Sequence, residues 1–192
     1  MRARDNPFAS NLISRLRCHF PPSHSWDSLL LRLQRLEYRG AITGPMGSGK
    51  TTILEELAVR LEKQGRQTRL AGLTIQHRQI PDPGHFFANL ESTILILDGA
   101  EQLNWLSWQR FLRQSRHAAG LIITTHQPGR LPTLFTCATT PALLDNLLTQ
   151  LHIPPGSPLR LQARRLFDLH CGNLREVLRS LYDSCSTLPH PL

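Results

Sequence analysis

One short segment constrains the fold of this chain most: residues 44–51 match the pattern G-x-x-x-x-G-K-[ST] in full. An apolar run at 41–43 precedes the segment, and apolar residues spaced for one helix face follow it at 50–64. Gly44, Gly47 and Gly49 let the backbone turn its N–H groups toward an anion, and the start of the helix adds its positive end. The segment therefore predicts a phosphate-binding loop that joins a strand to a helix in an α/β fold.

The residue types in this loop predict separate roles. We expect Lys50 to reach the β- and γ-phosphates of ATP and the hydroxyl of Thr51 to ligate Mg²⁺. The alternative is a glycine-rich turn that binds nothing, but the Lys-Thr pair would have no packing purpose in such a turn. The residues expected to bind the nucleotide are Gly44, Pro45, Met46, Gly47, Ser48, Gly49, Lys50, Thr51 and Thr52.

A second apolar run, at 93–97, ends in an acidic residue, Asp98. The carboxyl ends of parallel strands meet at one edge of a sheet, so Asp98 is expected to face the same crevice as the loop and to hold Mg²⁺. The alternative for Asp98 is a helix-capping role. Glu101 follows three residues later and is expected to orient or deprotonate the attacking water, or else to serve as a charge at a helix N-terminus.

A third apolar run, at 121–123, is followed by Thr124, Thr125 and His126. These polar side chains are expected at the same sheet edge, where they could read the γ-phosphate. We count Thr125 and His126 among the candidate catalytic residues, together with Lys50 and Glu101. For the threonines, plain β-propensity is the alternative explanation.

Apolar runs and helical patterns alternate over 38–140, which predicts a three-layer α/β sandwich with a five-stranded parallel sheet. An additional strand lies between the two motifs in the sequence. The strand of Asp98 is therefore not expected to be the neighbour of the loop's strand, which favours ATPases over simple nucleoside kinases. The expected strands are 41–43, 68–74, 93–97, 121–125 and 134–138, and the expected helices are 50–64, a short one near 85–90, and 103–117.

Two flanking regions lack strand patterns. Residues 1–37 are expected to form a lead-in with one amphipathic helix at about 27–36. Residues 141–192 are expected to form a C-terminal helical lid with a loose tail at 187–192. The helices expected in the lid are 142–151, 159–169 and 173–183.

Composition indicates the compartment and the class of partner. No apolar stretch reaches the length of a membrane span, and the first residues lack the apolar block of a secretion signal. Cys18, Cys137, Cys171 and Cys185 show no C-x-x-C pair, so we expect neither a disulfide framework nor a zinc site. A cytoplasmic, non-membrane protein is predicted. The net charge of +8 favours acidic partners or nucleic acid, although the surplus is spread along the chain.

With these segments identified, residues 6–183 resemble the AAA+ and STAND branches of P-loop ATPases. The sequence at 97–101, Leu-Asp-Gly-Ala-Glu, resembles the STAND form of the metal-binding strand. The sequence at 122–126 resembles a strand that ends in Thr-Thr-Arg in that class, but His126 replaces the arginine, and Gln102 stands where a second acid is usual. The fold that this resemblance implies is a P-loop NTPase core followed by a helical lid.

Two further segments carry a resemblance. Residues 172–176 resemble the start of the last lid helix of AAA+ proteins, which implies that Arg175 leans over the nucleotide as a sensor. An ordinary helix start capped by Asn173 is the alternative. Residues 6–8 and 131–134, together with the loop, also resemble small uncharacterised bacterial ATPases of planctomycete type.

The resemblance implies an ATP-binding ATPase that works with Mg²⁺ as a slow nucleotide-driven switch through its lid. Both departures from the family pattern, His126 and Gln102, point to slow hydrolysis. One alternative is a DNA-associated ATPase loader or transposition-type helper, and another is a small-molecule kinase. If a homo-oligomer supplies a catalytic arginine, the candidates are Arg113, Arg116 and Arg130.

Overall fold

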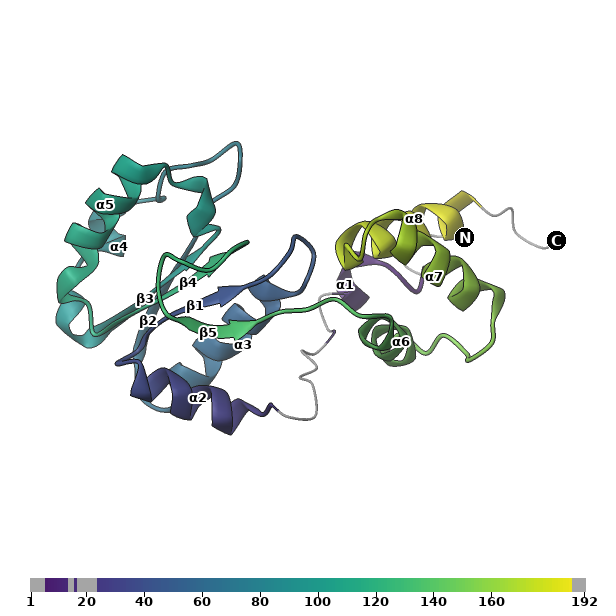
Figure 1. Cartoon of the computed structure of the whole chain (residues 1–192), viewed down its shortest axis with the longest axis horizontal. Coiled ribbons are helices and arrows are strands. Elements are labelled where there is room, and N and C mark those ends of the chain that lie inside the picture. The colour runs from purple at the N-terminus through teal and green to yellow at the C-terminus, as the bar shows by residue number, and fades with distance from the viewer. Residues whose placement is uncertain (1–5, 14–15, 17–23, 188–192) are drawn as a thin grey trace. The chain divides into compact units, whose positions relative to one another are not determined.

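The computed structural model describes residues 6–13, 16 and 24–187, which form two compact units (Figure 1). One unit contains the sheet and comprises the described residues among 20–44 together with Gly49–Cys137. The other is helical and comprises the described residues among 1–19 and 138–192, with Pro45–Ser48. The division predicted at 1–37, 38–140 and 141–192 stays a prediction.

The first unit is built on a five-stranded parallel sheet, as the sequence predicted. Its strands are β1 (Arg39–Thr43), β2 (Gln67–Gly72), β3 (Thr93–Asp98), β4 (Gly120–Thr125) and β5 (Thr133–Thr136). They lie in the order β2-β3-β4-β1-β5, and every pairing is parallel. The strand of Asp98 is therefore not next to β1, as expected, and the strand between them is β4.

The two central strands are buried along their whole length apart from Asp98, which is half-buried. Their sequences, Thr-Ile-Leu-Ile-Leu-Asp and Gly-Leu-Ile-Ile-Thr-Thr, are continuous apolar runs rather than alternating ones. Strands that are covered on both faces require this pattern, because neither face meets water. Polar side chains occur mainly where the runs end, so the carboxyl edge of the sheet becomes the polar edge.

Helices cover both faces of the sheet (Figure 1). Leu95, Leu97 and Ile123 pack in one core cluster with Trp108 and Phe111 of the helix that follows β3. The alternate strand residues, such as Ile94 and Ile96, are fully buried on the opposite face, and the helix after β1 contacts β1, β3 and β4. The helices of this unit are α2 (Trp26–Arg35), α3 (Lys50–Lys63), α4 (Pro83–Phe86), η2 (Leu90–Ser92), η3 (Ala100–Gln102), α5 (Trp105–Gln114) and η4 (Ser115–His117).

The helical unit contains α1 (Ser10–Ile13), α6 (Pro141–Gln150), α7 (Pro158–Leu169) and α8 (Leu174–Thr187). Phe8 is 1% exposed and lies in the same core cluster as Leu148, Phe167 and Leu181. The side-chain amide of Asn6 donates to the carbonyl of Tyr182 at 2.9 Å. The described N-terminal residues 6–13 therefore belong to the core of the C-terminal helices, whereas α2 belongs to the other unit.

Several element ends differ from the predicted ones. β2 stops at Gly72 rather than at residue 74, because Thr74 N–H donates to the carbonyl of His77 in a turn. The helix expected near 85–90 is the single turn α4, which begins where the side chain of Asp82 accepts from His85 N–H. α8 continues to Thr187. The remainder of the predicted tail, residues 188–192, and Cys18 lie outside the described residues.

Candidate functional site

The loop begins where β1 ends and leads directly into α3. Gly49 precedes α3 with φ +84°, a left-handed conformation that favours glycine, although a Cβ there would meet nothing within 4 Å. α3 has 14 residues, no side-chain cap at its N-terminus and no acidic residue in its first turn. No side chain therefore caps the N-terminus of α3, the end of a helix that favours an anion.

Two polar side chains of the loop are buried. Lys50 is 8% exposed, and its ammonium donates to the carbonyl of Gly44 at 2.8 Å. Ser48 is 6% exposed, and its Oγ has no hydrogen-bond partner among the described residues. A buried hydroxyl without a partner loses free energy relative to water, so this donor set suits a polar ligand such as a phosphate.

Asp98 lies at the carboxyl end of β3, and both of its oxygens accept hydrogen bonds from hydroxyls. Thr51 Oγ1 donates to Oδ2 at 2.8 Å, and Thr124 Oγ1 donates to Oδ1. Thr124 Oγ1 in turn accepts from Gly99 N–H at 2.8 Å. The structure thus brings together the predicted metal ligands Thr51 and Asp98, with Thr124 fixing the carboxylate. Hydroxyl and carboxylate oxygens are hard donors of the kind that Mg²⁺ binds.

Gly99 sets the direction of the chain after Asp98. Its φ is +77°, and a Cβ at this position would stand 2.5 Å from the carbonyl oxygen of Leu73. Both the conformation and the lack of space require glycine. The turn that follows places Glu101 in the short helix η3.

Glu101 is held by the residue that follows β4. Its Oε1 lies 3.2 Å from Nε2 of His126. Its Oε2 is buried and has no hydrogen-bond partner among the described residues. Two predicted site residues, which follow β3 and β4 respectively, therefore contact each other.

Arg130 is a further charged neighbour of Glu101. Its guanidinium lies 4.9 Å from the ring centre of Trp108 and donates to the carbonyl of Leu103 at 2.6 Å. Burial lowers the pKa of Arg130, and the negative charge of Glu101 acts in the opposite direction. The sequence suggested Arg130 only as an arginine for a neighbouring subunit, because loop contacts leave no periodic signal.

The other predicted residues lie elsewhere. Thr125 is buried, and its hydroxyl donates to the carbonyl of Gln127 at 2.7 Å, while Thr124 takes the position beside Asp98. The register of β3 and β4 pairs Leu97 with Ile123, and this was the signal that could have selected Thr124. Arg175 is exposed in the first turn of α8, in the helical unit.

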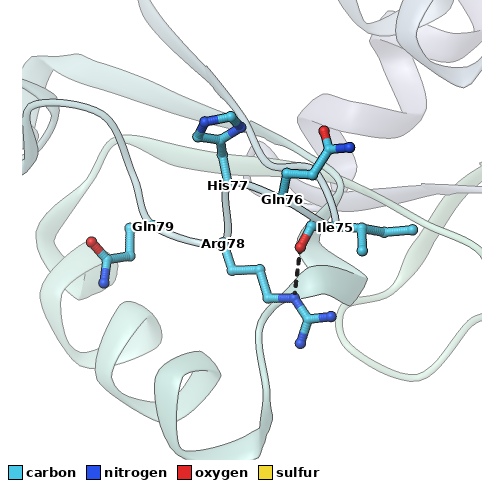
Figure 2. Close-up of a pocket in the computed structure, with 5 residues that line it drawn as sticks. All are labelled: Ile75, Gln76, His77, Arg78 and Gln79. Carbon is cyan, nitrogen blue, oxygen red and sulfur yellow. Dashed lines mark hydrogen bonds between the residues drawn. The ribbon is translucent and has the colours of Figure 1, made fainter.

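A hollow of about 340 Å³ lies in the segment that follows β2. It is lined by Ile75, Gln76, His77, Arg78 and Gln79. Figure 2 shows the side chain of Arg78 folded back on its own loop, where Nε donates to the carbonyl of Ile75 at 3.2 Å. The lining comes from one continuous segment and does not include Asp98 or Glu101, so we give the hollow no role in the site.

Two further features do not occur among the described residues. No group of three or more His, Cys, Asp or Glu side chains is arranged to hold a metal ion there. None of the helices in the described part of the chain is long and apolar enough to cross a membrane.

Comparison with known proteins supports the architecture. The structure is similar to replication initiator DnaA bound to AMPPCP and single-stranded DNA, with a TM-score of 0.59 and 12% identity. The match covers 81% of this chain and 58% of the DnaA chain, so this chain spans less than two thirds of that protein. The fold is that of a P-loop NTPase.

Other matches are more distant. The Thermotoga maritima RuvB Holliday junction branch migration motor matches with a TM-score of 0.43 and 12% identity, over 82% of this chain and 67% of that one. The P-loop NTPase domain of an E. coli sigma-54 transport activator matches with a TM-score of 0.38 and 17% identity, over 69% of this chain and 90% of that one. No protein-family model and no curated protein matches the sequence.

Proposed function

We propose that this chain is an ATP-binding P-loop ATPase that works with Mg²⁺ as a slow nucleotide-driven switch. The observation that carries the proposal is the Thr51–Asp98–Thr124 network at the carboxyl edge of the sheet. Thr51, in the first turn of the helix that follows the phosphate-binding loop, donates to Asp98 at the end of β3, and these two side chains would be the oxygen donors for Mg²⁺. The DnaA structure that shares this fold was determined with the nucleotide analogue AMPPCP, which is consistent with this assignment.

Different residues would bind the phosphates and the metal ion. Residues 44–52 would hold the triphosphate through backbone N–H groups, with Lys50 at the β- and γ-phosphates. Thr51 and Asp98 would hold Mg²⁺. The bound ion would neutralise the negative charge that develops on the phosphates during the reaction. Thr125 and His126 lie at the end of β4, where a γ-phosphate reader would be needed.

Slow turnover fits the surroundings of Glu101. Glu101 is the candidate for orienting the attacking water. Its neighbour His126 stands where a STAND-like strand has arginine, and Gln102 stands where a second acid is usual. The switch needs an element with two states. The helical unit, with Arg175 in the first turn of α8, is the candidate for this element.

The test is release of free phosphate from Mg-ATP by the purified full chain, at several protein concentrations. Glu101→Gln is expected to keep nucleotide binding and to lower turnover on the order of 100-fold, as expected for loss of a general base. Glu91→Gln, which alters an exposed glutamate on η2, is the matched control and should change neither. Unchanged turnover in Glu101→Gln would remove Glu101 from the mechanism, and a phosphorylated metabolite in place of free phosphate would indicate a kinase.

A DNA-associated ATPase is the second candidate function, because α5 exposes one aromatic side chain and two arginines. On α5, Trp105 is 70% exposed and Leu106 is 61% exposed, and Arg110 and Arg113 are exposed beside them. The sequence contains no Asp or Glu from residue 102 to 144. An exposed indole among arginines suits stacking on unpaired bases next to phosphates. The DnaA neighbour was determined with single-stranded DNA.

This second function predicts that single-stranded DNA stimulates phosphate release and binds less tightly as salt is added. Trp105→Ala and Arg113→Ala should each reduce DNA binding without changing nucleotide affinity. Binding of poly-glutamate with the same affinity as DNA would instead indicate an acidic protein partner.

A further inference from the structure

The side chain of Asn173 lies directly against Gly47 of the phosphate-binding loop. A Cβ at Gly47 would overlap Oδ1 of Asn173 and would stand 2.8 Å from its Cγ. Both residues belong to the helical unit, which includes Pro45–Ser48. The φ of Gly47 is +73°, so the conformation and the lack of space both require glycine. The residue that precedes α8 is therefore fitted to the backbone of the loop.

Asn173 is also fixed by its own helix. Its Oδ1 accepts a hydrogen bond from Glu176 N–H at 3.3 Å, as the side chain of a helix N-cap does. The preceding residue, Gly172, has φ +81°, and a Cβ there would stand 2.7 Å from Oγ1 of Thr139. One oxygen atom thus both caps α8 and lies against Gly47. The helix cannot shift on the loop without disturbing its own cap.

The loop at this contact has a polar group that a ligand could satisfy. Ser48 follows Gly47, and its buried Oγ has no hydrogen-bond partner among the described residues. A phosphate that supplied this partner would restrict the motion of the loop backbone. Because Asn173 rests on the same backbone, a more rigid loop would leave the start of α8 less freedom to open.

Arg175 takes part in this contact through its backbone. Its atom nearest to a Cβ at Gly47 is the backbone nitrogen, at 3.1 Å. The residue as a whole is exposed. The packing of α8 on the loop therefore does not depend on the guanidinium of Arg175.

We propose that Asn173 is a positioning residue that couples phosphate binding at the loop to the stability of α8. This inference rests on the proposed ATPase function. It goes beyond that function because it assigns the coupling to a neutral side chain on the loop backbone rather than to the charge of Arg175. Coupling of this kind requires a change in the freedom of α8 and no change in its average position.

The experiment is amide hydrogen exchange of α8, measured by mass spectrometry on the purified full chain with and without a non-hydrolysable ATP analogue and Mg²⁺. In the wild type, the analogue should slow exchange in the first turns of α8 at least about fivefold, the lower end of ordinary coupling between two sites. The ratio of the two rates is compared between variants, so a general loosening of α8 does not count as lost coupling.

Asn173→Ser should remove most of this slowing. Serine still caps a helix, but its side chain is too short to reach Gly47, so the substitution separates the cap from the contact. Because coupling is reciprocal, the Kd for the analogue should weaken by about the same factor as the slowing that is lost.

Asn104→Ser is the matched control, because Asn104 caps α5 in the same way, with its side chain accepting from Ser107 N–H at 2.8 Å. It should leave the response of α8 unchanged. Full slowing in Asn173→Ser would overturn the inference, as would a wild type that binds the analogue with no change in α8. A wild type that does not bind the analogue would refute the proposed function itself, which is a separate result.

Discussion

The two units of this molecule each contain a buried polar cluster, and the clusters are built in opposite ways. In the helical unit, Arg160 is 9% exposed and donates to the carbonyls of Ile153 and Pro154. Its guanidinium also lies 3.6 Å from the carboxylate of Asp145, which pairs with Arg164 at 2.8 Å. The carboxylate of Asp145 thus lies between two arginines, and the donors of Arg160 serve to close the connection from α6 to α7.

At the sheet edge a carboxylate is held without any basic partner in the described part of the chain. Among the described residues, the carboxylate of Asp98 accepts only from the hydroxyls of Thr51 and Thr124 and takes part in no ion pair. Neutral hydroxyls orient a carboxylate without cancelling its charge. A carboxylate that is paired with arginines stabilises the fold, whereas one that is held only by hydroxyls keeps its negative charge for a cationic ligand. This contrast separates the structural cluster from the candidate functional one.

The contrast predicts its largest stability effect in the helical unit. Arg160→Ala leaves several carbonyls without a donor and removes one of the two arginines at Asp145, so the free energy of unfolding should fall by about 3 kcal/mol. Urea unfolding followed by circular dichroism measures this value. Arg165→Ala, an exposed arginine on the same helix, should change it by less than about 0.5 kcal/mol. Equal effects of the two substitutions would remove the structural role of the Arg160 cluster.

At the sheet edge, substitution of Asp98 should remove the effect of Mg²⁺ on nucleotide affinity rather than lower the free energy of unfolding. Asp98→Asn keeps the shape of the side chain and removes its charge, so Mg²⁺ should no longer strengthen nucleotide binding. We expect the Mg²⁺ effect in the wild type to be at least about tenfold, or 1.4 kcal/mol. Titration of a nucleotide analogue with and without Mg²⁺ checks this. A variant that keeps the full Mg²⁺ effect would contradict the assignment of Asp98 as a ligand.

A smaller effect is predicted for the residue that orients this carboxylate. Thr124→Val removes the hydroxyl that joins Asp98 to Gly99, and the free energy of unfolding should fall by about 1 kcal/mol. Thr124→Ser keeps the hydroxyl and should recover much of the loss. Denaturation midpoints of both variants measure these changes. A Thr124→Val variant as stable as the wild type would show that the network does not stabilise the fold.

The smallest predicted effect is a difference in alkylation rate between two cysteines of the helical unit. Burial raises the pKa of the Cys185 thiol, which leaves less of the reactive thiolate at a given pH. Cys171 is exposed, so an alkylating reagent at pH 8 should modify Cys171 well before Cys185. Peptide mapping by mass spectrometry measures the order. Similar rates at the two residues would indicate that the helical unit opens readily.

The parts of the fold that the sequence predicted well are those with strong local signals. β3 and β4 are uninterrupted apolar runs, and the glycine-rich loop lies between β1 and α3 as its pattern required. The choice of Thr124 over Thr125 depends on the register of two strands, which composition does not reveal. Phe8 in the helical core could not be predicted either, because residues 6–13 show no periodicity over a useful length.

The positive charge shows a similar limit of sequence reasoning. Arg39 donates to the carbonyls of Ser115, Arg116 and Ala118 after α5, and Arg69 donates to carbonyls at the end of α4. Cations suit these positions because the last carbonyls of a helix carry partial negative charge. Part of the surplus of +8 therefore serves the fold, and net charge alone overstates what is available to a partner.

The most direct test of the central claim is calorimetric titration of a non-hydrolysable ATP analogue with Mg²⁺ into the wild type, Lys50→Ala and Lys63→Ala. Lys63 is an exposed lysine at the other end of α3 and serves as the control. We predict binding by the wild type and by Lys63→Ala, and binding at least about 100-fold weaker by Lys50→Ala, which loses a charged hydrogen bond to phosphate. No heat of binding with the wild type, or equal affinity in Lys50→Ala, would contradict the account.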